Sequence, residues 1–418
     1  MKILIVNTSE RTGGAAIAAQ RIAKAIRATK GQDVKVTFLS AERGLKAKLR
    51  KALECLVVFI HNGFSKNNMF SISIANTGTD ITKTKEFKEA DVVHLHWINQ
   101  GMLSLDVIRK ILQSGKPVVW TMHDMWPFTG VCHNTTTCTQ FHSRCQHCGL
   151  FDHKPILPFM RDLTTRVFDK KSKVYSSAKI TFVGCSRWIS NQASRSALTK
   201  GHKIISIPNT LDTDIFAPGN KIEARKGLNL PLEKYLILFS SRRVTDLSKG
   251  INYLYEAILL MLNQYPELRE RIGLVVLGGK AEETKNGQTD VIQRISHYID
   301  YTSSETKLSE IYNAVDMYVT PSLQDNLPNT IMEALACGVP CVGFNTGGIP
   351  EMIDHKLNGY VAQYADTEDL KNGIYWTMQH TDSEHLKTHA RQKVLDTYAP
   401  AIIASQYYET YLSLFVSV

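Results

Sequence analysis

The sequence predicts an α/β protein with two doubly wound, Rossmann-like domains, each built on a parallel sheet with helices on both faces. A chain of 418 residues exceeds the size of one compact core, so two domains are expected. Its short apolar runs are continuous rather than alternating, which is typical of parallel strands buried on both faces. Longer amphipathic stretches separate these runs, as helices do in such folds.

The apolar runs predict the strands in chain order. We expect strands at residues 2–6, 91–97, 117–122, 179–184 and 203–207, then at residues 235–241, 273–279, 316–320 and 339–344. Between the runs, apolar residues recur every four positions at Ala18, Ile22 and Ile26, and residues 254–262 repeat this spacing. The alternation of strand and helix predicts parallel sheets with helical crossovers.

The domain boundary is expected near residues 207–220, which are dense in Pro, Asn, Asp and Gly and cannot continue a strand or a helix. We therefore predict an N-terminal domain at residues 1–207 and a C-terminal domain at residues 208–400. Residues 401–418 should form a helix that returns to the N-terminal domain. The two domains are expected to face each other across a cleft lined by their strand ends, where open α/β sheets bind ligands.

Composition excludes several classes of protein. An apolar fraction of 43% with 21% charged residues excludes a disordered chain and a small fold held by disulfides. The longest apolar run, residues 55–60, is far shorter than the about 20 residues of a membrane-spanning helix. Residues 1–14 enter a strand-like run and show no signal peptide. We expect a cytoplasmic protein that is not integral to a membrane.

Charge is divided unequally along the chain. Residues 1–207 hold 31 Lys and Arg against 13 Asp and Glu, whereas residues 208–418 hold 18 against 26. A basic half suggests an anionic partner, although a solvated surface explains it as well.

Residues 43–64 are basic and carry leucines at positions 45, 49, 53 and 56. This helix could lie on an anionic membrane surface or pack on its own domain.

Residues 321–340 give the most specific signal. A helix should begin at Pro328 and Asn329, and Gly338 and Pro340 should end it. Backbone N–H groups near Asn329 and Thr330 would form a seat for a diphosphate. Two carboxylates flank this helix start: Asp325 lies in the loop before it, and Glu333 on its first turns could accept both hydroxyls of a ribose.

Three other segments carry polar groups at predicted strand ends. Arg242, Arg243 and Lys249 follow the strand at 235–241, so three cations should lie beyond its carboxyl end. His123 ends the strand at 117–122 beside an Asp, so it should lie at the carboxyl edge of the sheet. Gly13 and Gly14 follow the first strand, where glycines allow backbone to approach a phosphate.

These motifs resemble those of the retaining GT-B glycosyltransferases of family 4, the glycosyl transferases group 1. Asp325-x7-Glu333 resembles the E-x7-E signature of that family, with Asp in place of the first Glu. The resemblance implies a GT-B fold, a contact of Asp325 with the transferred sugar and of Glu333 with the nucleotide ribose. Residues 240–250 resemble the family's R-x4-K-G loop, but Val244 occupies the position of the Arg.

The resemblance also implies roles for other residues. Lys249 should bind the diphosphate with Arg243, or with Arg242 as second choice, and no catalytic metal is expected. His123 should contact a hydroxyl of the donor sugar, and the loop of Gly13 and Gly14 should reach the donor or the acceptor. The expected partners are a UDP- or GDP-sugar and a glycan or lipid-linked acceptor. Such an enzyme would serve bacterial surface polysaccharide synthesis, peripherally at the inner face of the plasma membrane.

The strand at 91–97 contains two further histidines. We expect His94 and His96 to face opposite sides of the strand, with His94 in the core and His96 as a candidate cleft residue.

The eight cysteines fall into two groups. Cys132, Cys138, Cys145 and Cys148 lie within one short insert and close on a C-x2-C, a spacing that fits a structural zinc ion with no open position for catalysis. Similar inserts occur in some members of the family that the chain resembles. The other four lie in apolar segments and should be buried small residues: Cys55, Cys185, Cys337 and Cys341.

Two other functions remain open. A sugar-nucleotide epimerase has a similar architecture but would release no free nucleoside diphosphate, and it needs acid and base carboxylates that the sequence does not reveal. A zinc-containing nucleic-acid-binding protein would account for the basic half and the cysteines, and its affinity would fall steeply with salt. It would leave the acidic half and residues 321–340 without a role, so no nucleic acid partner is expected. The absence of a G-x-G-x-x-G fingerprint argues against an NAD enzyme.

Overall fold

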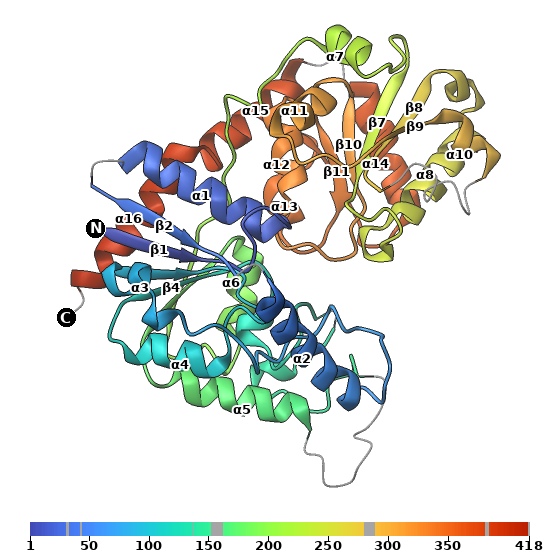
Figure 1. The fold of residues 1–418 in the computed structure, drawn as a ribbon. Helices are drawn as coiled ribbons and strands as arrows, with labels where there is room; N and C mark the ends of the chain where they lie inside the picture. The colour runs from blue at the N-terminus through green and yellow to red at the C-terminus, as the bar shows by residue number, and fades with distance from the viewer. Residues whose placement is uncertain are drawn as a thin grey trace. The chain divides into compact units, whose positions relative to one another are not determined.

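The chain folds into two compact units, each built on its own parallel sheet (Figure 1). A computed structural model describes residues 1–30, 33–41, 44–135, 137–151, 162–279, 289–380 and 384–416. The N-terminal unit comprises Met1–Thr210 and Ile403–Val418, and the C-terminal unit comprises Leu211–Ile402. The predicted boundaries at residues 207 and 400 thus lie within three residues of those in the structure.

The N-terminal unit has a six-stranded sheet in the order β2-β1-β3-β4-β5-β6, with every pair parallel. Its strands are β1 (Lys2–Val6), β2 (Lys35–Leu39), β3 (Val92–Leu95), β4 (Val118–Met122), β5 (Ile180–Gly184) and β6 (Lys203–Ser206). Its helices are α1 (Gly14–Lys30), α2 (Leu45–His61), α3 (Lys85–Glu89), α4 (Leu105–Gln113), α5 (Leu163–Tyr175), α6 (Arg187–Ser194) and most of α16 (Pro400–Val416).

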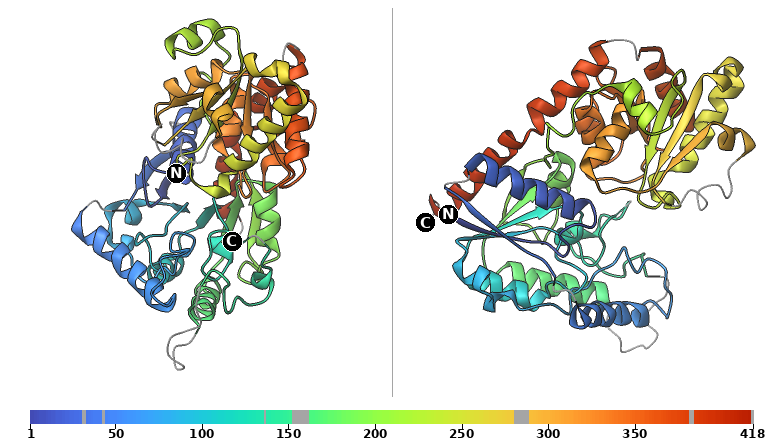
Figure 2. Two further views of the ribbon diagram at one scale, coloured as in Figure 1. Left: turned by 90° about the vertical axis from the view of Figure 1, so that its right-hand side faces the viewer. Right: turned by 45° about the horizontal axis from the view of Figure 1, so that its top comes forward.

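Successive residues of the central strands pack into two separate cores. Ile3 and Ile5 of β1 face α1 and α16, whereas Leu4 and Val6 face the core that includes α4 and α5. Figure 2 shows these helices in two layers with the sheet between them. Both faces of the sheet are therefore buried, which explains the continuous apolar runs in the sequence.

The C-terminal unit repeats the architecture with the order β12-β11-β10-β7-β8-β9, again all parallel. Its strands are β7 (Tyr235–Ser240), β8 (Ile272–Leu277), β9 (Ser296–Ile299), β10 (Met317–Thr320), β11 (Cys341–Phe344) and β12 (Gly359–Ala362). Its helices are α7 (Lys221–Gly227), α8 (Ile251–Gln264), α10 (Asp290–Ile295), α11 (Glu305–Asn313), α12 (Asn329–Ala336), α13 (Ile349–Met352), α14 (Thr367–His380) and α15 (Glu384–Thr397).

The predicted fold class is confirmed, and all nine predicted strands are present. Three strands were missed, namely β2, β9 and β12, and each lies at an edge of its sheet. Their residues are mostly only partly buried, so their sequences lack the continuous apolar character of a central strand. None of the helices in the described part of the chain is both long and apolar enough to cross a bilayer.

In each unit the strand order reverses direction at one point. In the C-terminal unit the chain runs from β7 through β8 to β9 on one side, and from β10 through β11 to β12 on the other. In the N-terminal unit the corresponding point lies between β1 and β3. Loops that leave the carboxyl ends of the two strands at such a point diverge, and the opening between them is where doubly wound sheets bind ligands.

Candidate functional site

The reversal point of the C-terminal unit brings together two of the segments singled out above and a third loop. The loop after β7 carries Arg242, Arg243 and Lys249, and the loop after β10 carries Asp325 and leads into α12. A third loop follows the neighbouring strand β11. All three leave carboxyl ends of adjacent strands, so they meet at the same edge of the sheet.

Two glycines allow these loops to approach closely. Gly250 has φ +72°, and a Cβ placed there would lie 1.9 Å from the carbonyl oxygen of Pro321. Gly347, in the loop after β11, has φ +56°, and its Cβ would lie 1.7 Å from the carbonyl oxygen of Asp325. Any side chain at either position would separate the loops. The pair Gly347-Gly348 follows a predicted strand, as Gly13-Gly14 does, so this signal was present in the sequence and was missed.

Lys249 and Asp325 form an ion pair at this edge. The Lys249 ammonium donates to a carboxylate oxygen of Asp325 at 2.7 Å, and both side chains are half-buried. Asp325 raises the pKa of Lys249, which outweighs the opposing effect of burial. The lysine therefore stays protonated, and its position is fixed by its partner. The sequence predicted both residues as site residues but not their contact.

The two arginines of the same loop are exposed, unlike Lys249. The guanidinium of Arg242 lies over the ring of Tyr301, with 5.9 Å between Cζ and the ring centroid. Val244 is buried in the core of the unit, so an Arg at that position would have to be desolvated. Arg243 lies beside Val244 on the surface, and its role in assisting Lys249 stays a prediction.

Helix α12 begins at Asn329 after Pro328, as predicted, and ends before Gly338, which has φ +74°. No side chain caps its N-terminus. Asn329 and Thr330 are both partly buried at the edge of the loop that Asp325 occupies. The helix N-terminus therefore lies at the reversal point, where its dipole favours an anion.

Glu333 lies one turn further along α12 and is only 4% exposed. Its carboxylate accepts a hydrogen bond from the Tyr312 hydroxyl at 3.1 Å. Burial, and then the charge of Glu333, raise the pKa of Tyr312 well above its usual value, so the tyrosine remains a donor. A buried carboxylate held in this way is oriented before any ligand arrives. Tyr312 itself gave no recognisable signal in the sequence.

In the N-terminal unit, the glycine loop and the histidines surround the other reversal point. Gly13 has φ +96°, and its carbonyl accepts the N–H groups of Ala16 and Ile17 at the start of α1. Gly14 is the first residue of α1. The Thr8 hydroxyl, which follows β1, donates to the Asn99 carbonyl at 2.8 Å and links this loop to the one after β3.

The histidines form a row, and one prediction about them is wrong. His94 and His96 were expected on opposite faces of the strand, but their ring centroids lie 4.2 Å apart, because residues two positions apart share a face. His94 is in the core as predicted, where Tyr411 and Thr121 bind its two ring nitrogens. His96 is 2% exposed, so it is not an open cleft residue.

His123 extends this row to the carboxyl edge. Its Nε2 lies 2.9 Å from Nδ1 of His96, and it is partly buried. Burial lowers the pKa of His123 to about 4 and that of His94 to about 3, so both imidazoles are neutral near pH 7. His123 directly follows β4, at the end of the row of histidines. Its predicted contact with a sugar hydroxyl stays a prediction.

The neighbouring Asp124 has a structural role. Its carboxylate accepts the indole N–H of Trp97 at 2.7 Å and lies 2.6 Å from Nδ1 of His133. Burial would raise the pKa of Asp124, but these hydrogen bonds and the interaction with His133 lower it overall. Asp124 thus ties the start of the cysteine-rich insert to the sheet.

The insert itself brings its four cysteines near one another. Cys132 and Cys145 are buried, Cys148 is partly buried beside Cys132, and Cys138 is exposed. Lys171 is fully buried among them and Trp126, and burial lowers its pKa to about 7. Of the other four cysteines, Cys185, Cys337 and Cys341 are buried as predicted, and Cys55 is only partly so.

Within the described ranges, no group of three or more His, Cys, Asp or Glu side chains is arranged to hold a metal ion. The observed arrangement does not fit a preformed zinc site, so zinc stays a prediction from the spacing. Protein purified without chelator should contain about one zinc per chain if the four thiolates of the insert bind it. Metal analysis that finds none would remove zinc from the account.

Two family models match this chain. Residues 12–215 match the family model described as Glycosyltransferase Family 4, and residues 234–380 match the model described as Glycosyl transferases group 1. The first match covers most of the N-terminal unit, and the second lies within the C-terminal unit. The second of these contains the three loops at the reversal point, from Arg242 to Gly348.

Curated relatives of these glycosyltransferase domains share modest identity over part of their length. A D-inositol 3-phosphate glycosyltransferase of Saccharomonospora viridis is 28% identical over 172 residues, which cover 39% of each chain. The N-acetyl-alpha-D-glucosaminyl L-malate synthase of Bacillus anthracis is 25% identical over 51% of this chain and 55% of the relative. The first of these alignments thus spans about two fifths of the relative's length.

Solved structures match the whole chain. Sucrose-phosphate synthase from Thermosynechococcus elongatus has a TM-score of 0.66 at 16% identity, with 100% of both chains covered. HepE of Anabaena in complex with UDP has a TM-score of 0.63 at 16% identity, with 99% of this chain and 100% of HepE covered. At such identities the likeness shows the fold, which is the predicted GT-B fold.

Proposed function

We propose that this protein is a retaining glycosyltransferase that moves a sugar from a nucleoside diphosphate donor to an acceptor hydroxyl. The observation that carries the proposal is the grouping of Lys249, Asp325 and Glu333 at the reversal point of the C-terminal sheet, beside the N-terminus of α12. Sequence relatives named as glycosyltransferases support the reaction class. The crystal structures of HepE with UDP and with UDP-glucose support a nucleotide-sugar donor, for which we propose a UDP- or GDP-sugar.

Each group has a chemical task in this proposal. The ammonium of Lys249, with Arg243 and Arg242, would neutralise the diphosphate as it leaves, and the N–H groups near Asn329 and Thr330 would bind its oxygens. Glu333 would accept the ribose hydroxyls. Asp325 would lie near the sugar, where its negative charge favours the oxocarbenium-like centre of the transition state. Because Asp325 also holds Lys249 in place, the cation needs little reorganisation during the reaction.

We propose that no catalytic metal takes part, because protein cations would supply the charge that a divalent ion would otherwise provide. For the acceptor we propose a glycan or lipid-linked glycan of bacterial surface polysaccharide synthesis. The corresponding location is the cytoplasm, at the inner face of the plasma membrane. The basic composition of residues 1–207 supports an anionic surface as the neighbour of such an enzyme.

The decisive experiment is to incubate the protein with a panel of sugar nucleotides without acceptor and to measure the nucleoside diphosphate released. We expect slow release from one UDP- or GDP-sugar, at an equal rate with EDTA or magnesium. Release that requires magnesium would contradict the metal-free assignment. Conversion of the sugar without any free nucleoside diphosphate would instead indicate a sugar-nucleotide epimerase.

A further inference from the structure

Helix α2 of the N-terminal unit presents its leucines to solvent rather than to the core. Leu45, Leu49, Leu53 and Leu56 are 82%, 57%, 44% and 51% exposed. Their spacing of four, four and three residues places them on one face of the helix. A surface helix normally turns such a stripe toward its own core, so this outward row requires another explanation.

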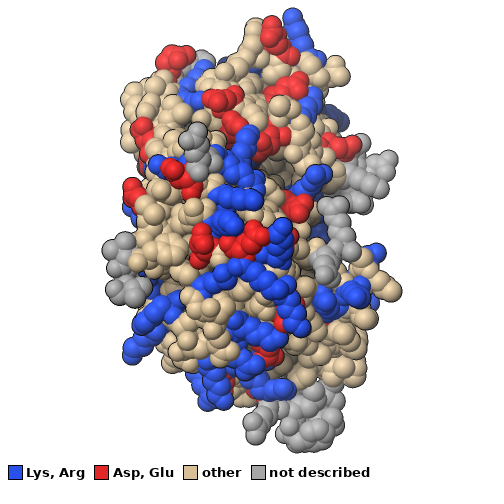
Figure 3. Space-filling view, turned by 60° about the vertical axis from the view of Figure 1, so that its left-hand side comes forward, with Lys and Arg blue, Asp and Glu red and all other residues tan. Residues whose placement is uncertain are grey.

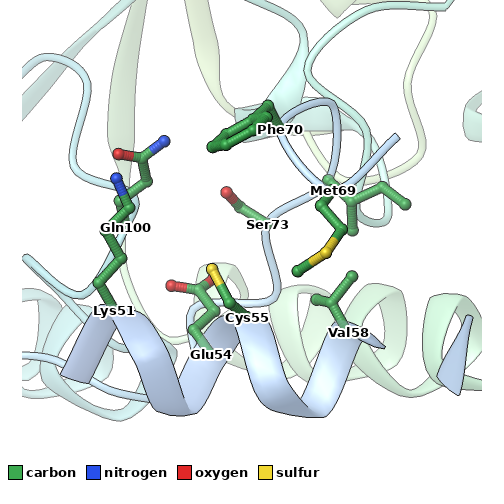
Figure 4. Close-up of a pocket in the computed structure, with 9 residues that line it drawn as sticks. Lys51, Glu54, Cys55, Val58, Met69, Phe70, Ser73 and Gln100 are labelled. Atoms are coloured by element: carbon green, nitrogen blue, oxygen red, sulfur yellow. The ribbon is translucent and has the colours of Figure 1, made fainter. Parts of the chain in front are cut away.

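The opposite face of α2 is fixed to the unit by polar and apolar contacts. The buried residues of the helix are Glu54 and Val58. The Glu54 carboxylate accepts the backbone N–H groups of Ile74 and Ala75 at 2.8 and 2.9 Å. In Figure 4, Glu54 and Cys55 point from the helix into a pocket that Phe70 and Ser73 also line. The helix therefore cannot rotate its leucines inward without breaking these hydrogen bonds.

Cations border the row of leucines. Lys46 and Lys48 are exposed, and by helical spacing they lie on the two sides of the leucine face. Lysines in such positions extend their charges to lipid headgroups while the apolar face enters the interface. The aromatic rings of Phe64 and Phe70, which follow α2, are 60% and 72% exposed.

The N-terminal half of the chain has the same sign of charge, with 31 Lys and Arg against 13 Asp and Glu in residues 1–207. On the face that Figure 3 shows, Lys and Arg side chains gather on the N-terminal unit with few acidic residues between them, whereas the two signs alternate on the C-terminal unit. Self-association through the leucine row would bring the lysines of two copies together. Charge complementarity thus favours an anionic bilayer over a second copy of the chain.

We propose that the face of α2 formed by Leu45, Leu49, Leu53 and Leu56 docks on an anionic lipid bilayer, with Lys46 and Lys48 at the phosphate level. Helix α2 also packs against the loop after β3, because a Cβ on Gly101 would lie 3.1 Å from the backbone nitrogen of Lys51. Docking would therefore hold the carboxyl edge of the N-terminal sheet near the bilayer. A role of this docking in presenting a lipid-linked acceptor rests on the function proposed above. The docking itself is independent of that function.

The test is flotation of the full chain with vesicles of phosphatidylcholine, with or without phosphatidylglycerol. We expect the protein to float only with the anionic vesicles, and to float less at about 0.5 M salt because the charges are screened. Leu→Ser at the four α2 positions should lower the lipid partition coefficient about tenfold or more. K46E/K48E should also weaken binding to anionic vesicles, because two cations are replaced by two anions.

The matched control is I222S/L232S/L357S, which removes apolar side chains of the C-terminal unit that are 58%, 44% and 47% exposed. It should float as the wild type does. Failure of the wild type to float, or equal flotation of the four-leucine variant, would overturn the proposal. The proposal would also be overturned if the wild type is a dimer that does not float and the four-leucine variant is a monomer. The leucine row would then be an interface between two copies of the chain.

Two further measurements keep the outcomes separate. If the four-leucine variant melts below the wild type, L45S/L49S serves in its place, because these two leucines are the most exposed of the row. Flotation is measured without donor, and nucleoside diphosphate release is measured without vesicles. A protein that floats but releases no nucleoside diphosphate would support the docking surface and contradict the proposed reaction.

Discussion

Replacing Lys249 by Ala is expected to lower kcat for sugar transfer about 100-fold to 1000-fold, the usual cost of losing one preorganised charge at a developing anion. The ammonium lies 2.7 Å from Asp325 and is the least exposed cation of the loop after β7. The measurement is steady-state release of nucleoside diphosphate from the best donor of the panel. The affinity for the sugar nucleotide should fall less than kcat, because the charge on the diphosphate grows as the bond breaks.

A comparable lysine provides the control for this variant. Lys307 forms an ion pair with Glu310 at 2.8 Å in the same unit, and its side chain is 40% exposed, against 34% for Lys249. K307A should change kcat less than about twofold, since a surface pair contributes little. Lys249→Arg keeps the charge and should recover part of the activity. Equal kcat values for K249A and K307A would contradict the role of Lys249.

Replacing Glu333 by Ala is expected to raise the Kd for the nucleoside diphosphate about 10-fold to 100-fold, because a charge-assisted pair of ribose hydrogen bonds would be lost. The variant should also unfold more easily, by about 1–3 kcal/mol, because the buried Tyr312 hydroxyl would lose its acceptor. Calorimetric titration with nucleoside diphosphate gives the first quantity, and urea unfolding gives the second.

The Tyr312 contact allows the two effects to be separated. Tyr312→Phe removes the hydroxyl that donates to Glu333 but leaves the carboxylate in place. It should lower the free energy of unfolding, and it should raise Kd less than E333A does. Glu333→Gln keeps an acceptor for Tyr312 and should weaken nucleotide binding with a smaller loss of stability. If E333A binds nucleotide as the wild type does, the ribose assignment is wrong.

The parts of the fold that the sequence predicted are those that burial controls. β1, β4, β7 and β8 are buried on both faces, so their apolar runs are continuous and easily found. The edge strands β2, β9 and β12 pair on one side only and are mostly partly buried, so their sequences are less continuously apolar. The specific strand order within each doubly wound sheet could not be read from the sequence, because hydrophobicity does not specify which strands are neighbours.

The candidate site shows the same division. Lys249, Asp325 and Glu333 were identified from their local patterns, but the pairing of Lys249 with Asp325 joins residues 76 positions apart. Tyr312 lies on another helix and has no motif of its own. The error on His94 and His96 was avoidable, since the spacing of two already places both imidazoles on one face of the strand.

The path of α16 has a consequence for biosynthesis. Its residues Ile403, Tyr407 and Tyr411 fill the N-terminal core beside α1, although about two hundred residues of the other unit are translated before them. The C-terminal unit is one uninterrupted segment and can mature as soon as it leaves the ribosome. The N-terminal unit is synthesised first, but part of its apolar core stays exposed until α16 has been translated. We therefore expect the nascent chain to depend most on chaperones during this interval.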